Sequence, residues 1–217
     1  MKLSAAARAR LPALLVLGLI VAVAAWLRWT DLALCELKYD EAVALDLTLP
    51  LVEGTGFPRV GLVSSVEVKN PPLMMYLLAL PMLVSLDPVF VTGFVGALAV
   101  LAVALTYFVL RRRFGDFVAL GASALWATAP WAVLYARKLW AQSLLAIFVV
   151  LLLHVLFVIV ERRKSWHVAW VPILLCALGQ LHLSAIAAVP ILGLVVLWRA
   201  RAQKAVMGDC AVSLKAA

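Results

Sequence analysis

The sequence predicts an all-α, polytopic integral membrane protein with about six transmembrane helices and an external loop that holds a juxtamembrane helix. Of its 217 residues, 66% are hydrophobic and only 14% are charged, whereas soluble domains are about 45–50% apolar. The apolar residues gather in long runs, and the basic residues stand in short clusters at the ends of these runs. A chain of this size and composition cannot hide its apolar surface inside a water-soluble globule, so we expect it in a membrane.

Six segments are predicted to span the bilayer, since a span needs about 20 apolar residues with a tolerated range of about 17–25. Four runs meet this length directly. The apolar stretch from Val168 to Trp198 is long for one span, and basic clusters flank both of its ends. A hairpin of two short helices turning near Gln180–Ser184 satisfies both flanks. The predicted spans are 11–27, 88–110, 117–135, 141–160, 168–180 and 183–198, which make residues 1–204 one module, with 205–217 predicted to be a disordered tail.

The basic clusters also predict the orientation, because cytoplasmic segments of membrane proteins carry an excess of Lys and Arg. Clusters at residues 2–10, 111–113, 162–164 and 199–204 would all lie on one side under the six-span topology. We therefore expect a multi-pass protein of the plasma (inner) membrane with its N-terminus in the cytoplasm. The net charge of +8 is explained by this topology, so we expect membrane lipids and no nucleic acid as partners.

The predicted external loop, residues 30–87, contains most of the acidic residues of the chain. Orientation does not depend on acidic residues, so their concentration here indicates a separate role. The second part of the loop contains the apolar segment "PPLMMYLLALPMLVSL", which is too short to span comfortably and has Pro81 in its middle. It is predicted to form a juxtamembrane helix at the outer interface.

The adjacent acids Asp40 and Glu41 in "LKYDEAVALD" admit two interpretations. Asp40 is a suitable N-cap for a helix through Ala42–Leu49, and Glu41 would then lie favourably in the first turn. Asp40 could also act as a general base at the outer mouth of the helical bundle. The two roles are compatible.

Other polar residues are predicted to lie near the same outer face. Lys69 and Asn70 precede a Pro-Pro pair, which is a rigid helix start, and their side chains could also reach a lipid phosphate. Arg137 and Lys138 stand on the outer side against the charge bias, where they would bind either lipid headgroups or an anionic phosphate group. His182 lies at the proposed outer turn, either as part of the same site or as an ordinary turn residue.

Four motifs occur in a recognisable order along the chain: "YDEA" after the first span, "SSVEVKNPPLMMYLLALP" before the second, "LRRRFG" after it, and "PWAVLYARKLWAQSLL" across the third and fourth. This order resembles the N-terminal part of the C-type polytopic glycosyltransferases, and most of all the bacterial relatives of protein O-mannosyltransferases and aminoarabinose transferases (glycosyltransferase families 39 and 83). The resemblance covers about residues 10–200. Because members of these families are usually longer, it implies an N-terminal module or fragment of such an enzyme.

The resemblance implies transfer of a sugar from a polyprenyl-phosphate donor to a protein, lipid or glycan acceptor on the outer face of the membrane. Asp40 is then the expected catalytic base. Family members usually carry His or Lys before the Pro-Pro pair and an acid early in the fourth span, where this chain has Asn70 and Gln142. The residues expected to bind substrate are Glu41, Lys69, Asn70, Arg137, Lys138, Gln142 and His182.

Two other classes of protein remain open at this point, a small multi-pass transporter subunit and a non-catalytic membrane scaffold. A transporter would normally place polar residues along a pathway inside the spans, but His154 is almost the only one there. No metal ligands are predicted from the residue spacing, and the resemblance leaves a divalent metal requirement open.

Overall fold

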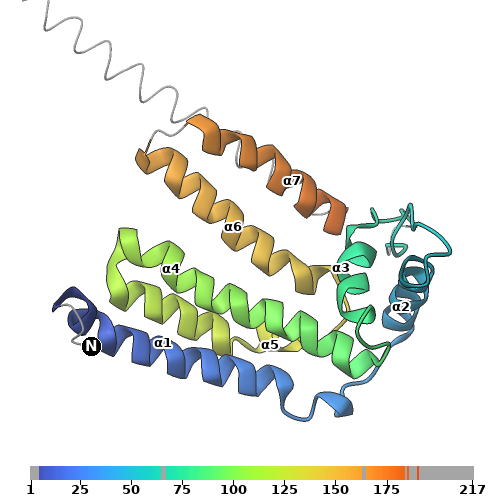
Figure 1. Ribbon diagram of the computed structural model, residues 1–217, viewed down its shortest axis with the longest axis horizontal. Coiled ribbons are helices and arrows are strands. Elements are labelled where there is room, and N and C mark those ends of the chain that lie inside the picture. The colour runs from blue at the N-terminus through green and yellow to red at the C-terminus, as the bar shows by residue number, and fades with distance from the viewer. Residues whose placement is uncertain (1–4, 65–66, 163–164, 184, 186–189, 191–217) are drawn as a thin grey trace, which may run out of the picture.

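The computed structural model describes residues 5–64, 67–162, 165–183, 185 and 190. This part of the chain is helical and contains no β-strand, which confirms the predicted all-α class. Figure 1 shows α1, α4, α6 and α7 side by side, with α2 and α3 at one end of this bundle. The elements are α1 (Ala5–Trp29), η1 (Leu32–Leu34), α2 (Tyr39–Val52), α3 (Leu73–Met82), α4 (Pro88–Thr128), α5 (Pro130–Tyr135), α6 (Ala141–Arg162), η2 (Ser165–Ala169) and α7 (Trp170–Leu181).

Three described helical segments are long and apolar enough to cross a membrane. They are Arg10–Leu34, Pro88–Thr128 and Ala141–Ile159. At 1.5 Å per residue, the 22 residues of α6 extend about 33 Å, which matches a hydrocarbon core of about 30 Å. Large apolar side chains on α1 point outward, and Leu15 and Leu19 are about two-thirds exposed. A lipid environment would cover this surface.

The helix α4 is a hairpin of two antiparallel limbs, as Figure 1 shows. The chain reverses at Gly115, whose φ of 79° and ψ of 171° interrupt the helical backbone. The Tyr107 hydroxyl donates a 2.8 Å hydrogen bond to Asp116 across this turn. Further along, Val103 and Ala127 belong to the same buried apolar cluster. The two limbs therefore pack against each other along their length.

Three of the six predicted spans lie within helical segments that are long and apolar enough to cross a membrane. Span 11–27 lies within α1, span 88–110 within the first limb of α4, and span 141–160 within α6. Span 117–135 is interrupted at Ala129, whose extended ψ of 123° is the conformation favoured before a proline, here Pro130. Span 168–180 is formed by the end of η2 and by α7. Most of 183–198 and all of 205–217 lie outside the described residues.

The predicted external loop is packed onto the end of the bundle. The apolar segment expected to form a juxtamembrane helix contains α3, and α3 packs against α2. Met75 and Leu78 of α3 are completely buried, in one cluster with Leu139 and with Leu181 of α7. Because residues from distant parts of the chain share this cluster, α2 and α3 hold a defined position beside the start of α6 and the end of α7.

The buried side chain of Arg28 joins two helices. It is completely buried near the end of α1. Its guanidinium donates to the carbonyl oxygens of Ala24 at 3.1 Å, Ala127 at 2.9 Å and Trp126 at 3.3 Å. The last carbonyl groups of a helix have no partner within the helix, so Arg28 satisfies two of them at the end of the second limb of α4.

Replacement of Gly115 by alanine is expected to destabilise the protein by about 1–3 kcal/mol, because its φ and ψ lie in a region that is essentially restricted to glycine. A Cβ at Gly115 would meet no atom within 4 Å, so the cost would come from the backbone alone. The measurement is the thermal unfolding midpoint of the purified protein in detergent. Gly121→Ala is the matched control in the second limb, where the added Cβ also has open space and alanine should be neutral or stabilising. Equal midpoints for the two variants would contradict the prediction.

Candidate functional site

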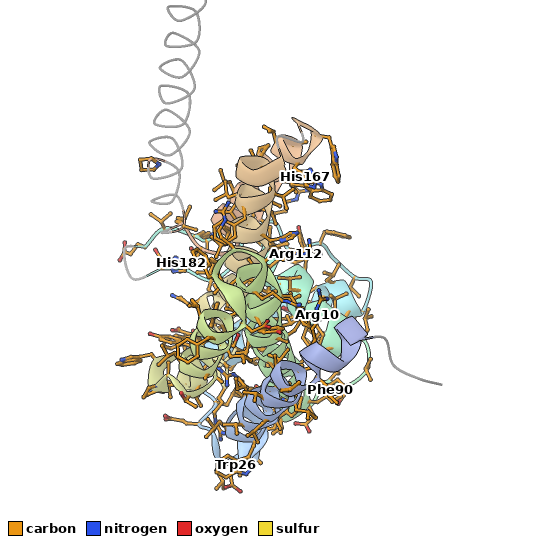
Figure 2. All side chains as sticks on the ribbon, turned by 90° about the vertical axis from the view of Figure 1, so that its left-hand side faces the viewer. Arg10, Trp26, Phe90, Arg112, His167 and His182 are labelled. Carbon is orange, nitrogen blue, oxygen red and sulfur yellow. The ribbon has the colours of Figure 1, made fainter. Side chains whose placement is uncertain are left out.

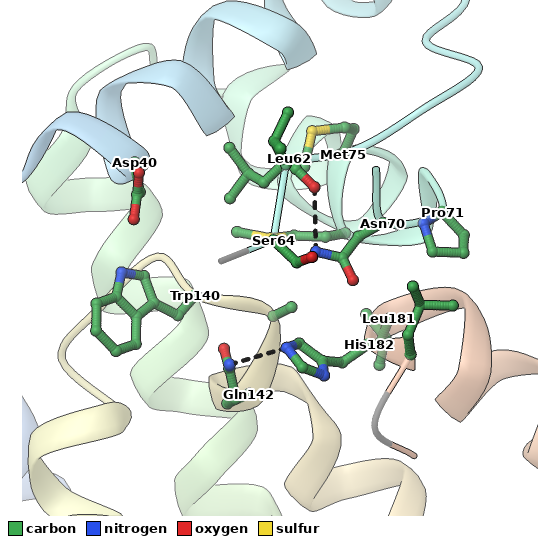
Figure 3. Close-up of a pocket in the computed structure, with 14 residues that line it drawn as sticks. Asp40, Leu62, Ser64, Asn70, Pro71, Met75, Trp140, Gln142, Leu181 and His182 are labelled. Atoms are coloured by element: carbon green, nitrogen blue, oxygen red, sulfur yellow. Dashed lines mark hydrogen bonds between the residues drawn. The ribbon is translucent and has the colours of Figure 1, made fainter. Parts of the chain in front are cut away.

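A pocket of about 410 Å³ lies at the end of the bundle where α2 and α3 pack. Its walls come from the start of α2, the segment before α3, the start of α6 and the end of α7. Figure 3 shows Asp40 and Trp140 on one side and Asn70 with His182 on the other. Four of the eight predicted site residues line this pocket, namely Asp40, Asn70, Gln142 and His182.

Asp40 lies in the first turn of α2 with its side chain exposed to solvent at the pocket. The prediction that Asp40 is the N-cap is wrong, because Lys38 occupies that position with an extended backbone, φ −84° and ψ 165°. The Lys38 carbonyl accepts from the Ala42 backbone N–H at 3.0 Å, so α2 begins at Tyr39, one residue before Asp40. The Asp40 carboxylate is therefore not used in capping, and the helix N-terminus interacts favourably with negative charge at this place.

Glu41 is turned inward and is only 2% exposed. Its Oε1 lies 3.9 Å from Nζ of Lys138, whose side chain is 17% exposed. The Lys138 ammonium also lies over the ring of Trp140, 4.9 Å from its centroid. The structure therefore joins the "YDEA" segment to the "YARKLWAQ" segment through a largely buried ion pair.

Burial raises the pKa of the Glu41 carboxyl above its ordinary value, since desolvation disfavours the charged form. The charge of Lys138 and a hydrogen bond from the Leu139 backbone N–H lower the pKa but do not fully compensate. The charge of Lys138 therefore offsets part of the effect of burial on the Glu41 carboxyl.

Arg137 was expected to bind the anionic sugar-phosphate substrate, but its guanidinium forms hydrogen bonds with carbonyl groups at the end of α1. It donates to the carbonyl oxygens of Leu27 at 2.9 Å, Thr30 at 2.7 Å and Asp31 at 3.1 Å, and to Sγ of Cys35 at 3.2 Å. Arg137 does not line the pocket. Of the two predicted cations in this segment, Lys138 is the one joined to the acidic pair.

Asn70 is 8% exposed and fixes the segment before α3. Its backbone N–H and its Nδ2 both donate to the Leu62 carbonyl, at 2.9 Å and 3.0 Å. Lys69 is exposed, forms an isolated antiparallel bridge with Val63, and does not line the pocket. Asn70, rather than Lys69, therefore stands at the wall of the pocket.

Gln142 and His182 form a polar pair in the lower part of the view in Figure 3. Nε2 of Gln142 lies 3.1 Å from Nε2 of His182. Gln142 is at the start of α6, and His182 follows the last residue of α7 with an extended backbone. The pair brings together the beginning of one helix and the end of another at the pocket that Asp40 also lines.

Sequence reasoning missed the part that Trp140 and Ser64 take in this pocket. Both line it, and within the described chain Trp140 Nε1, Ser64 Oγ and Asn70 Oδ1 are buried without a hydrogen-bond partner. Both residues lie inside motifs that carry the resemblance, Ser64 in "SSVEVKNPPLMMYLLALP" and Trp140 in "PWAVLYARKLWAQSLL", but neither was among the predicted site residues. Buried polar atoms normally have a partner, and these three unpaired atoms all belong to residues that line one pocket.

The pocket combines an exposed carboxylate, unpaired hydrogen-bonding atoms and apolar walls that include Met74, Met75 and Leu181. It could hold a molecule with both polar and apolar parts and place a base beside it. Within the described residues, no group of three or more His, Cys, Asp or Glu side chains could hold a metal ion. In comparisons with known proteins, no family model, no curated protein and no solved structure matches this chain.

Proposed function

We propose that the chain is a membrane glycosyltransferase, or the N-terminal module of one, that transfers a sugar from a polyprenyl-phosphate donor to an acceptor at the outer face of the plasma membrane. The observation that carries this proposal is the pocket itself. It gathers Asp40, Asn70, Gln142 and His182 from four separate segments, and the first three are positions that the resemblance to polytopic glycosyltransferases singles out.

The polar atoms of the pocket suit a sugar. Sugar hydroxyl groups both donate and accept hydrogen bonds, so they could pair with the Trp140 donor, the Asn70 acceptor and the Ser64 hydroxyl. The apolar side chains of Met74, Met75 and Leu181 could contact the sugar's apolar face or the first units of the polyprenyl chain. Such a mixed lining is typical of ligand pockets, which are mostly apolar with a few placed polar groups.

The proposed reaction needs a base and a stabilised leaving group. Asp40 takes the proton from the acceptor hydroxyl while that oxygen attacks C1 of the sugar, and the bond between C1 and the phosphate oxygen breaks. The polyprenyl phosphate leaves with the electron pair as an anion. Gln142, His182 and the nearby Lys138 are the groups that would stabilise the developing charge on the phosphate.

The proposed topology has six spans with Asp40 outside. The pocket lies at the end of the bundle where α2 and α3 pack. Arg10 stands near the start of α1, and Arg111 and Arg112 stand just before the reversal of α4. Figure 1 shows the N-terminal end of α1 and the reversal of α4 at the other end of the bundle from α2 and α3. This separation is what a cytoplasmic N-terminus and an external loop at 30–87 require. A polyprenyl-linked donor enters from the bilayer, so a pocket at the end of the spans is accessible to it.

Photolabelling tests the proposed donor site. A polyprenyl phosphate carrying a diazirine beside the phosphate should label peptides that contain Trp140–Gln142 and Leu181–Leu183. An excess of unlabelled polyprenyl phosphate should abolish this labelling, whereas polyprenol without the phosphate should compete only weakly. If the label is instead spread over the apolar helices and neither competitor reduces it, the proposal is wrong and a non-catalytic scaffold is favoured.

A further inference from the structure

A second cavity, of about 530 Å³, lies at the opposite end of the bundle from Asp40. It is bounded by the beginning of α1, the end of the first limb of α4, and the second half of α6. Figure 2 looks at this end and shows Arg10 and Arg112 close together. The polar residues that line the cavity are Arg10, Arg111, Arg112 and His154.

The cavity carries net positive charge. Arg111 is partly neutralised by Asp116, with Nε 3.7 Å from Oδ1, and its guanidinium lies 5.3 Å from the centroid of the Tyr107 ring. In the part of the chain that the structure describes, no carboxylate lies within ion-pair distance of Arg10 or Arg112. These two arginines come from separate helices and line the same cavity, so an anion bound there could contact both.

The walls beneath the arginines are apolar and face outward. Phe108 on α4 is 46% exposed, and Leu151 on α6 is 38% exposed. Both line the cavity, together with Leu105, Val109 and Phe157. Because α4 and α6 are two of the segments long and apolar enough to cross a membrane, these walls would continue into the hydrocarbon region. His154 interrupts the apolar surface on α6 and supplies one hydrogen-bonding group.

The arginines lie beside outward-facing apolar walls, and this combination matches the shape and charge of an anionic phospholipid. The phosphate of an anionic phospholipid could accept hydrogen bonds from two guanidinium groups, and its acyl chains could lie along the helices below. A soluble anion would use the arginines and leave the apolar walls unused. A zwitterionic lipid would fit the walls but would add a third cation beside Arg10 and Arg112.

We propose that this cavity binds an anionic phospholipid, with the lipid phosphate between Arg10 and Arg112 and the acyl chains against Phe108 and Leu151. Binding there would tie the start of α1 to the α4 hairpin and α6. The site does not depend on the proposed sugar transfer, since it shares no residue with the pocket around Asp40.

The test is native mass spectrometry of the purified chain in detergent, titrated with phosphatidylglycerol or phosphatidylcholine of the same acyl composition. We expect phosphatidylglycerol to bind more tightly. The Arg10→Gln, Arg112→Gln double variant should lose about 25-fold in affinity for phosphatidylglycerol, at about fivefold per arginine near a membrane surface. Arg59→Gln is the matched control, an exposed arginine that lines neither cavity, and its affinity should be unchanged.

A second variant keeps every charge and changes only the cavity. Leu151→Trp should fill the space beside Leu151 and lower phosphatidylglycerol binding at least fivefold, even if the arginine variant fails to insert. Retained binding in Leu151→Trp would show that the lipid associates with the basic surface and not with the cavity, and would overturn the proposal. Equal affinity for the two lipids would overturn it as well. Displacement of the lipid by an equal concentration of inorganic phosphate would identify an anion site and not a lipid site.

Discussion

Replacing Asp40 by asparagine is expected to lower the rate of sugar transfer from a polyprenyl-phosphate-linked donor by about 100- to 10,000-fold, the range that a positioned general base contributes. Asparagine has nearly the same shape and can still accept a hydrogen bond, but it cannot take the proton from the acceptor hydroxyl. Asp40 is exposed at the pocket and makes no contact that the fold requires. The variant should therefore insert and unfold like the wild type. The measurement is transfer of a radiolabelled sugar in vesicles that contain the protein.

Asp46→Asn is the matched control for this experiment. Asp46 lies in the same helix α2, is exposed like Asp40, and does not line the pocket. The same chemical change at Asp46 should leave the transfer rate within about twofold of wild type, as expected for a surface substitution outside the pocket. If Asp40→Asn transfers at the wild-type rate in the same vesicles, Asp40 is not the base and the catalytic part of the proposal is wrong.

The helices could be predicted from the sequence because they follow from local composition. An uninterrupted apolar run of about 20 residues has few alternatives to a helix in a bilayer, where every backbone polar group needs an internal partner. The reversal at Gly115 could also be anticipated, since Arg111–Arg113 interrupt the apolar run directly before it. The break at Ala129 was missed because the apolar composition continues through Pro130, although a proline restricts the residue that precedes it.

The roles of individual side chains in the site could be predicted only in part. The sequence indicated that Glu41 and Lys138 share a face of the protein, but not that Glu41 turns inward and Asp40 outward. Arg137 and Lys138 look equivalent as adjacent cations. Their roles separate only through contacts with residues about a hundred positions away, since Arg137 reaches the end of α1 and Lys138 reaches α2. Contacts between residues so far apart in the chain cannot be predicted from the pattern of a single sequence.

Lys138→Met is expected to destabilise the protein by about 3 kcal/mol at neutral pH, because it leaves the Glu41 carboxylate buried without its counter-charge. Methionine keeps most of the apolar length of the lysine side chain, so the loss would come mainly from the charge. The measurement is the free energy of unfolding in detergent. Lys38→Met is the matched control, since Lys38 pairs with Glu36 at 3.7 Å on the surface, and it should cost less than about 1 kcal/mol.

The pH dependence and a double variant separate this mechanism from a simple packing loss. The pKa of Glu41 is already raised by burial, and removing Lys138 takes away a charge that lowers it. A group with a raised pKa in the folded state contributes stability below its ordinary pKa and loses that contribution as the pH rises through the raised value. The cost of Lys138→Met should therefore be small in acid, where Glu41 is neutral, and should grow as the pH rises. Adding Glu41→Gln to Lys138→Met should recover most of the lost stability at neutral pH. If the loss of stability is instead independent of pH and unaffected by Glu41→Gln, Lys138 acts through packing against Trp140 and not through the ion pair.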